Sequence, residues 1–264
     1  MSQLTRSSDP SSLHRAMKAL EMALPAPGET LEQDEEWVVV RSKGAWKKIR
    51  LHDYADVYAI QGLYEKWIYE VFQCSSPQKI RELLAMELCE SDRTPADLPV
   101  LDLGAGNGCV AECLQEIGFK TFVGVDIYDA AAAAAERDRP GLYDDYVVGD
   151  LTNPTPENAK VLDRYDFACM TCVAALGFGD IPTEVFVEAY NRVRDAGLVA
   201  FTIKTDFLSD TDKTGFSALV RSMIQDDTLR IARQEEYVHR IDADGNELVY
   251  AAIVGEKLKD ARHI

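Results

Sequence analysis

The feature that most constrains the fold of this chain is a glycine-rich loop directly after a short apolar run. The run Val100–Leu103 leads into Gly104–Gly108, and an amphipathic pattern follows. Glycine suits positions where the backbone turns sharply or lies against a ligand, because it has no Cβ atom. The first N–H groups of a helix are free to bind such a ligand. The pattern therefore predicts a buried strand, a tight turn and a helix start that together form a ligand-binding loop.

The spacing of this loop favours one class of ligand over another. Its glycines alternate after an acidic residue, Asp102, whereas the dinucleotide-binding loop reads Gly-x-Gly-x-x-Gly. A carboxylate at this place suits a cofactor with an ammonium group better than one with a pyrophosphate. Two further apolar runs also end in an acid, since Asp126 follows Gly104 by twenty-two residues and Asp150 follows Asp126 by twenty-four.

Three acid-ended runs in this order and spacing resemble class I S-adenosylmethionine (SAM)-dependent methyltransferases, specifically uncharacterised bacterial methyltransferase domains of type 11/12. The resemblance covers roughly residues 77–256. It implies SAM as cofactor, S-adenosylhomocysteine (SAH) as product, and an α/β fold with a doubly wound, mostly parallel seven-stranded sheet. A terminal antiparallel hairpin is also implied, and Asp242–Asn246, between Leu229–Ile241 and Glu247–Glu256, is an independent hairpin signal.

The resemblance also implies roles for individual residues. Asp102 would face the methionine ammonium of SAM, directly or through water, although it could instead only cap the turn. Asp126 would accept hydrogen bonds from both ribose hydroxyls, because two vicinal donors match one carboxylate. Asp150 would accept from the adenine amino group. The remaining cofactor-binding residues implied in this way are Gly104, Ala105, Gly106, Asn107, Ile127, Leu151 and Thr171.

We expect two parts in the chain, an N-terminal extension over residues 1–76 and a SAM-binding core over residues 77–264. Alternating strand and helix patterns in the core predict a parallel sheet. In the extension, helical spacing covers Ser12–Leu24 and ends before Pro25–Gly28, and a short β-hairpin is expected over Trp37–Leu51.

The segment His52–Phe72 is rich in aromatic residues. We interpret it as a helical lid over the cofactor pocket, with Tyr54 and Tyr64 facing the ligand, because a tyrosine can close an apolar pocket and still offer a hydroxyl group. The alternative is a helix whose aromatic side chains only pack on the sheet.

Composition limits the partners that we expect. The net charge of −17 disfavours nucleic acid, and the one dense basic run, Arg41–Arg50, is interpreted as a solvated hairpin. No apolar stretch approaches the ~20 residues of a membrane helix, and polar Met1–Arg6 is not followed by a signal-peptide core. We therefore expect a soluble, cytoplasmic protein without a disulfide scaffold; a homodimer is left open.

The sequence predicts methyl transfer to a small molecule. It names no catalytic residue, because the transfer mainly requires an acceptor held in line with the methyl group and shielded from water. The four histidines are scattered without metal-ligand spacing. Two alternatives remain: a non-catalytic SAM-binding or scaffold protein, and a nicotinamide-dependent oxidoreductase, which the loop spacing and the lack of a Tyr-x-x-x-Lys pair disfavour.

Overall fold

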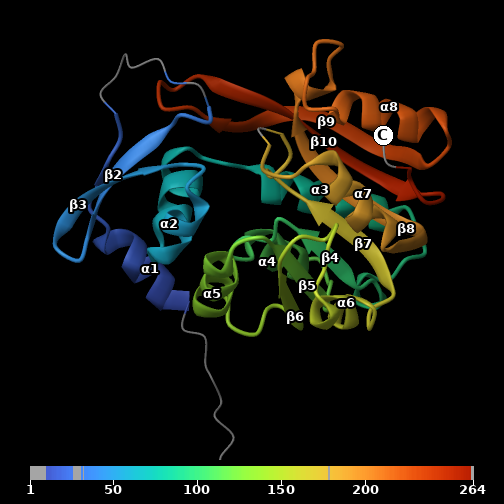
Figure 1. Ribbon diagram of the computed structural model, residues 1–264, viewed down its shortest axis with the longest axis horizontal. Helices are drawn as coiled ribbons and strands as arrows, with labels where there is room; N and C mark the ends of the chain where they lie inside the picture. The colour runs from blue at the N-terminus through green and yellow to red at the C-terminus, as the bar shows by residue number, and fades with distance from the viewer. Residues whose placement is uncertain (1–9, 26–30, 32, 178, 263–264) are drawn as a thin grey trace, which may run out of the picture.

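A seven-stranded sheet with helices packed on it lies beside a smaller three-stranded sheet (Figure 1). The structure is a computed structural model and describes residues 10–25, 31, 33–177 and 179–262. The strand order of the large sheet is β6-β5-β4-β7-β8-β10-β9. The order reverses between β4 and β7, which is where ligands bind in open α/β sheets.

Neighbouring strands from β6 to β8 in that order pair in parallel. The pairs β8–β10 and β10–β9 are antiparallel. The bounds are β4 Val100–Leu103, β5 Phe122–Asp126, β6 Asp145–Val148, β7 Phe167–Cys172, β8 Val193–Lys204, β9 Leu229–Ile241 and β10 Glu247–Lys257. The pairing of β9 with β10 contains two register shifts, at Leu248/Val249 and Val254/Gly255. The predicted fold class, including the terminal antiparallel hairpin, is confirmed.

Helices cover both faces of the sheet, and successive side chains of a strand point to opposite faces. In β4, Leu101 and Leu103 belong to one apolar cluster with α7 and α8, whereas Val100 belongs to another with α3 and α4. The helices of the core are α3 Ser76–Cys89, α4 Cys109–Gln115, α5 Asp129–Asp138, α6 Pro156–Leu162, α7 Thr183–Asn191 and α8 Phe216–Gln225, with short 3₁₀ turns η2 Pro95–Asp97 and η3 Thr205–Leu208.

The N-terminal part forms its own small sheet, in the order β1-β2-β3, followed by two helical pieces. Its elements are α1 Pro10–Ala19, β1 Met22–Ala23, β2 Trp37–Ser42, β3 Ala45–Arg50, α2 Tyr54–Ala59 and the π-helix η1 Glu65–Val71. The hairpin over residues 37–51 is confirmed. The helix expected to reach Leu24 ends at Ala19, because Met22 and Ala23 pair with β2 instead. The predicted stop at Pro25–Gly28 lies mostly outside the described residues.

The single lid helix expected over His52–Phe72 is wrong in detail, since the segment forms two pieces. Gly62 lies between them with a φ of +77°, and a Cβ atom there would be 3.0 Å from the backbone nitrogen of Met17. This positive φ breaks the helix, because residues with a Cβ atom rarely adopt it.

The segment between η1 and α3 contacts strand β9 of the large sheet. Ile241 donates its N–H to the carbonyl oxygen of Phe72, and Ser75 donates to that of His239, each at 2.9 Å. Ser76, the first residue of α3, is buried, and its Oγ lies 2.6 Å from the His239 Nδ1 atom. A boundary at residue 76 stays a prediction.

No helix among the described residues combines the length and the apolar character needed to cross a membrane. The six cysteines are free thiols.

Candidate functional site

A cavity of about 380 Å³ opens at the carboxyl ends of β4, β5, β6 and β7, between these strands and the segment that carries α2. Its wall is built from the residues that follow each strand and from three tyrosines of the N-terminal part. The lining residues are Tyr54, Tyr58, Tyr64, Leu103, Gly104, Val125–Tyr128, Gly149–Leu151, Val173–Ala175, Gly179–Pro182 and Val185.

Seven of the twelve residues expected to bind the cofactor lie on this wall. They are Tyr54, Tyr64, Gly104, Asp126, Ile127, Asp150 and Leu151. The other five are not among the described residues that line the cavity. They are buried in the glycine loop or beneath it. They are Asp102, Ala105, Gly106, Asn107 and Thr171.

Asp126 ends β5 on the cavity wall. Its Oδ1 accepts the N–H of Tyr128 and its Oδ2 accepts the N–H of Gly106, each at 3.0 Å. Burial raises the pKa of Asp126, while these backbone donors act in the opposite direction. Each oxygen keeps a further lone pair, so the carboxylate can accept two hydroxyl donors from a ligand in the cavity.

Asp102 lies beneath the loop, 1 % exposed. Thr171 Oγ1 and Tyr143 Oη each donate to its carboxylate at 2.7 Å. Burial raises the pKa of Asp102 to about 6 although both hydrogen bonds lower it. Asp102, the residue predicted to face the ammonium group of SAM, is thus held by two neutral donors behind the cavity wall. A contact with the ligand would run through water or need a shift of Tyr143.

The glycine loop is in contact with the tyrosines above it. Gly106 has a φ of +54°, and a Cβ atom on it would lie 2.4 Å from Tyr58 Oη. The carbonyl oxygen of Gly106 accepts the Tyr146 hydroxyl at 2.7 Å. A side chain at this position would therefore strain the backbone and displace Tyr58.

The part of the cavity near β6 suits a flat, polar-edged ring. Leu151 is buried, whereas Ile127 is 63 % exposed although it is large and apolar. Asp150 accepts both the N–H and the hydroxyl of Thr152 at 2.8 Å and remains exposed. Two apolar surfaces with a carboxylate beside them fit a nucleobase with an amino group.

Tyrosines cover the opposite side. Tyr54 and Tyr58 stack with ring centroids 6.2 Å apart, and Tyr64 lies 5.1 Å from Tyr58. The rings pack on the buried Ala131 and Ala134 of α5. Burial raises the pKa of all three hydroxyl groups well above the ordinary value, so they stay protonated and can donate hydrogen bonds at neutral pH.

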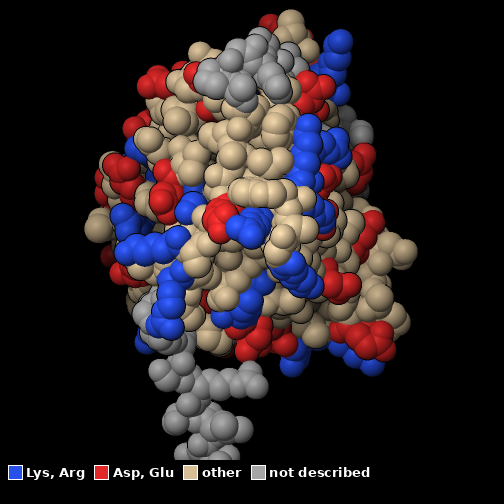
Figure 2. Space-filling model, turned by 90° about the vertical axis from the view of Figure 1, so that its left-hand side faces the viewer, with Lys and Arg blue, Asp and Glu red and all other residues tan. Residues whose placement is uncertain are grey.

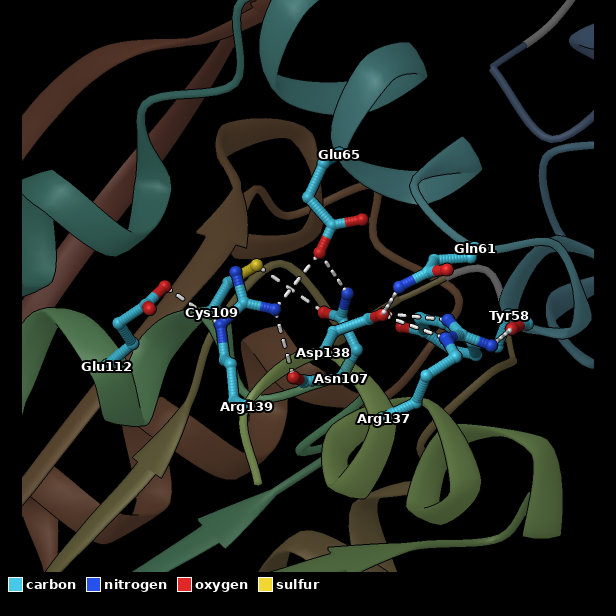
Figure 3. Close-up of polar contacts among 9 residues, drawn as sticks. All are labelled: Tyr58, Gln61, Glu65, Asn107, Cys109, Glu112, Arg137, Asp138 and Arg139. Atoms are coloured by element: carbon cyan, nitrogen blue, oxygen red, sulfur yellow. Dashed lines mark hydrogen bonds and ion pairs between the residues drawn. The ribbon is translucent and has the colours of Figure 1, made fainter. Parts of the chain in front are cut away.

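Polar contacts attach this cover to the loop beneath it (Figure 3). Glu65 of η1 accepts from the Asn107 side chain and, at 3.0 Å, from Arg139 Nη1. Arg139 also donates to the carbonyl oxygen of Asn107 at 3.1 Å and to Glu112 Oε2 at 2.8 Å. Arg137 donates to the carbonyl oxygen of Tyr58 at 3.0 Å. Asn107 therefore links the cover to the loop.

Several wall residues were missed by sequence reasoning. Tyr58 carried the same signal as Tyr54, from which it is four residues away, and could have been included. Tyr128 directly follows Ile127. Asp180, Ile181 and Pro182 come from the turn before α7, where the sequence shows a helix start but no sign that it reaches the cavity.

Comparison with known proteins agrees with this geometry. The family described as "Methyltransferase domain" matches residues 73–236. An S-adenosylmethionine-dependent methyltransferase from Clostridium acetobutylicum is similar in structure, with a TM-score of 0.50, 14 % identity, and 75 % of this chain and 96 % of that chain covered. No curated protein matches the chain.

A second similar structure belongs to the complex between the Haloferax volcanii Trm112 methyltransferase activator and a candidate methyltransferase. It has a TM-score of 0.52 and 16 % identity, and 80 % of this chain and 99 % of that chain are covered. At these identities the likeness shows the fold. The family match spans more than half of the sequence, so the chain belongs to the methyltransferase domain family. The prediction of a methyltransferase is confirmed, and so is the predicted fold of its core.

Proposed function

We propose that the protein transfers the methyl group of SAM to a small-molecule acceptor, with SAM bound in the 380 Å³ cavity. The observation that carries this proposal is the position of Asp126, whose carboxylate faces the cavity at the end of β5. Adenine would lie between Ile127 and Leu151 near Asp150, and the ribose hydroxyls would bond Asp126. The methionine part would extend past Gly104 towards Asp102.

The tyrosine cover and the surface charge support a small acceptor. Tyr54, Tyr58 and Tyr64 close the side of the cavity opposite the loop, which keeps water from the reacting groups. The net charge of −17 repels a phosphate backbone. No observation favours the non-catalytic or the nicotinamide alternative. Cytoplasmic location and a homodimer stay predictions.

The test is calorimetry of the full chain with SAM, SAH and NAD⁺. We expect SAM and SAH to bind and NAD⁺ not to bind. Asp126→Ala removes two hydrogen bonds to a charged acceptor, and we expect its SAM affinity to fall by ~2–4 kcal/mol, about 30- to 1000-fold. Asp163→Ala, an exposed acid after α6, serves as the control.

An unchanged dissociation constant in folded Asp126→Ala would remove the ribose assignment. SAM binding without formation of SAH in the presence of candidate acceptors would favour the scaffold alternative.

A further inference from the structure

Three carboxylates line the larger cavity, and the cofactor as placed above uses two of them. They belong to Asp126, Asp150 and Asp180. Asp126 and Asp150 follow β5 and β6, where ribose and adenine would lie. Asp180 comes instead from the turn between β7 and α7, and β7 lies beyond β4 in the strand order, away from β5 and β6. One carboxylate on the side away from adenine is therefore left for another ligand.

The carboxylate of Asp180 has room for a further donor. His52 Nδ1 lies 3.1 Å from its Oδ2, and Tyr54 Oη donates to the same oxygen at 3.5 Å. A carboxylate can accept about four hydrogen bonds. A neutral imidazole can donate a hydrogen bond, so the contact with His52 leaves Asp180 its negative charge.

Positive charge on the walls is absent or already neutralised. No Lys or Arg of the described residues lines the larger cavity. A smaller cavity of about 40 Å³ shares Asp180 with it and has Arg240 in its wall, but both terminal nitrogens of Arg240 donate to the buried Glu36. Burial lowers the pKa of His239, in the same wall, to about 3, so this side chain is neutral. The walls thus disfavour an anionic acceptor.

A second polar group on these walls is an acceptor without a donor. Gln33 lines the smaller cavity and donates its amide to Tyr250 Oη at 2.8 Å. Its Oε1 atom is buried and has no hydrogen-bond partner within the described part of the chain. A buried acceptor without a donor is costly. This oxygen, like Asp180, favours a ligand that brings N–H or O–H groups.

Aromatic rings surround the position next to Asp180. Tyr54 lies between Tyr58 and Tyr128, with ring centroids 6.2 Å and 6.1 Å away, and all three line the larger cavity. The face of an aromatic ring attracts an alkylammonium group. Tyrosine rings next to an unused carboxylate therefore favour a ligand with a cationic nitrogen over a neutral one.

We propose that the methyl acceptor is an amine whose nitrogen binds Asp180 and Tyr54 on the side of the cavity away from adenine. The inference rests on the proposed function. The amine loses a proton to water, and its nitrogen then bonds the methyl carbon while the bond from that carbon to sulfur breaks. The electron pair of the broken bond neutralises the sulfonium, and the product ammonium releases a proton to water. Asp180 accepts an N–H of the amine and stabilises the positive charge that develops on nitrogen.

The experiment measures SAH formation by the full-length protein with benzylamine and butylamine, and with benzyl alcohol and benzoate as compounds of matched shape. We expect SAH only with the two amines. In calorimetry of the SAH complex, benzylamine should bind and benzoate should not. These comparisons use the wild type and do not depend on the folding of a variant.

Variants then test the carboxylate itself. Asp180→Asn keeps the shape of the side chain and removes its charge, so kcat/KM for benzylamine should fall about 10- to 100-fold. The SAM dissociation constant should stay unchanged, and Asp180→Glu should restore part of kcat/KM. Asp163→Asn, an exposed acid after α6, is the matched control and should behave as wild type.

Three results would overturn the inference in a protein that binds SAM: no methylation of either amine, faster methylation of benzyl alcohol or benzoate than of benzylamine, or wild-type kcat/KM in folded Asp180→Asn. Absence of SAM binding would instead overturn the proposed function.

Discussion

Asp102 shows how burial sets the chemistry of a single residue in this fold. Its pKa rises from an ordinary value of 3.8 to about 6, and desolvation is the largest cause. Since the folded state holds this proton more tightly than the unfolded state, the free energy of unfolding falls as the pH rises from about 4 to about 6, and the loss persists above that range. A ligand ammonium near the carboxylate would act in the opposite direction.

Asp102→Asn removes this titration and keeps the shape of the side chain. We compare the free energy of unfolding of the variant with that of the wild type. The difference, variant minus wild type, should increase by ~3 kcal/mol between pH 4 and pH 7, because a shift of two pKa units corresponds to about 1.4 kcal/mol per unit. Urea titrations at both pH values measure it. Asp163→Asn should show no such increase, and a pH-independent difference for Asp102→Asn would contradict the buried, titrating carboxylate.

For single residues, the sequence predicts the positions that a local pattern encodes. An apolar run that ends in an acid places Asp126 and Asp150 at strand ends, and parallel strands bring those ends to one edge. The pairing of His52 with Asp180 has no local signal, because it depends on how the N-terminal part packs against the turn before α7.

The segment of α2 and η1 is the element that determines access to the cavity. Its polar contacts with the core include the ion pair of Glu65 with Arg139, whose side chains are 7 % and 8 % exposed. Tyr58 adds a close packing contact over Gly106. An element held by such contacts can open locally at a free energy well below that of global unfolding.

Glu65→Gln tests this attachment. Loss of the charged acceptor should destabilise the protein by ~2 kcal/mol and speed hydrogen exchange across residues 54–71. SAM should slow the exchange of this segment in the wild type, since closure protects amides. Glu112→Gln removes the exposed partner of the same arginine and should change stability by less than ~1 kcal/mol. Exchange that is equal in Glu65→Gln and wild type would show that the ion pair does not hold the segment.

Element boundaries were harder to predict than element types. The β9–β10 hairpin follows from the turn residues Asp242–Asn246, which are a local signal. The early end of α1 and the break at Gly62 depend on contacts with β2 and with Met17. These are tertiary contacts, which the periodicity of the sequence does not predict.

At the scale of the whole molecule, basic side chains lie among acidic ones. Figure 2 shows Lys and Arg side chains interspersed with Asp and Glu on one face, although the net charge is −17. In the basic run over β2 and β3, three cations are paired with acids: Arg41 with Glu21, Lys47 with Asp56, and Arg50 with Asp53. This pairing supports the interpretation of the run as a solvated hairpin.

The ion pair of Glu36 with Arg240 joins residues 204 positions apart, and both side chains are buried. Arg240→Met leaves Glu36 without its cation, and we expect a loss of ~3–5 kcal/mol in the free energy of unfolding. The double variant Glu36→Gln with Arg240→Met should recover part of this loss. Denaturant titration measures both. A double variant less stable than Arg240→Met would show that the pair is not the source of the effect.

The position of β9 has a consequence for how molecules of this protein meet one another. As the last strand of the large sheet, it exposes backbone groups that a strand of another molecule could extend. Its outer residues include Arg230, Arg233, Glu235 and Glu236, and the register shifts against β10 twist it locally. Charges of both signs and an uneven strand make poor templates for edge-to-edge growth. The same hairpin that contacts the N-terminal part thus also makes the β9 edge a poor site for polymerisation.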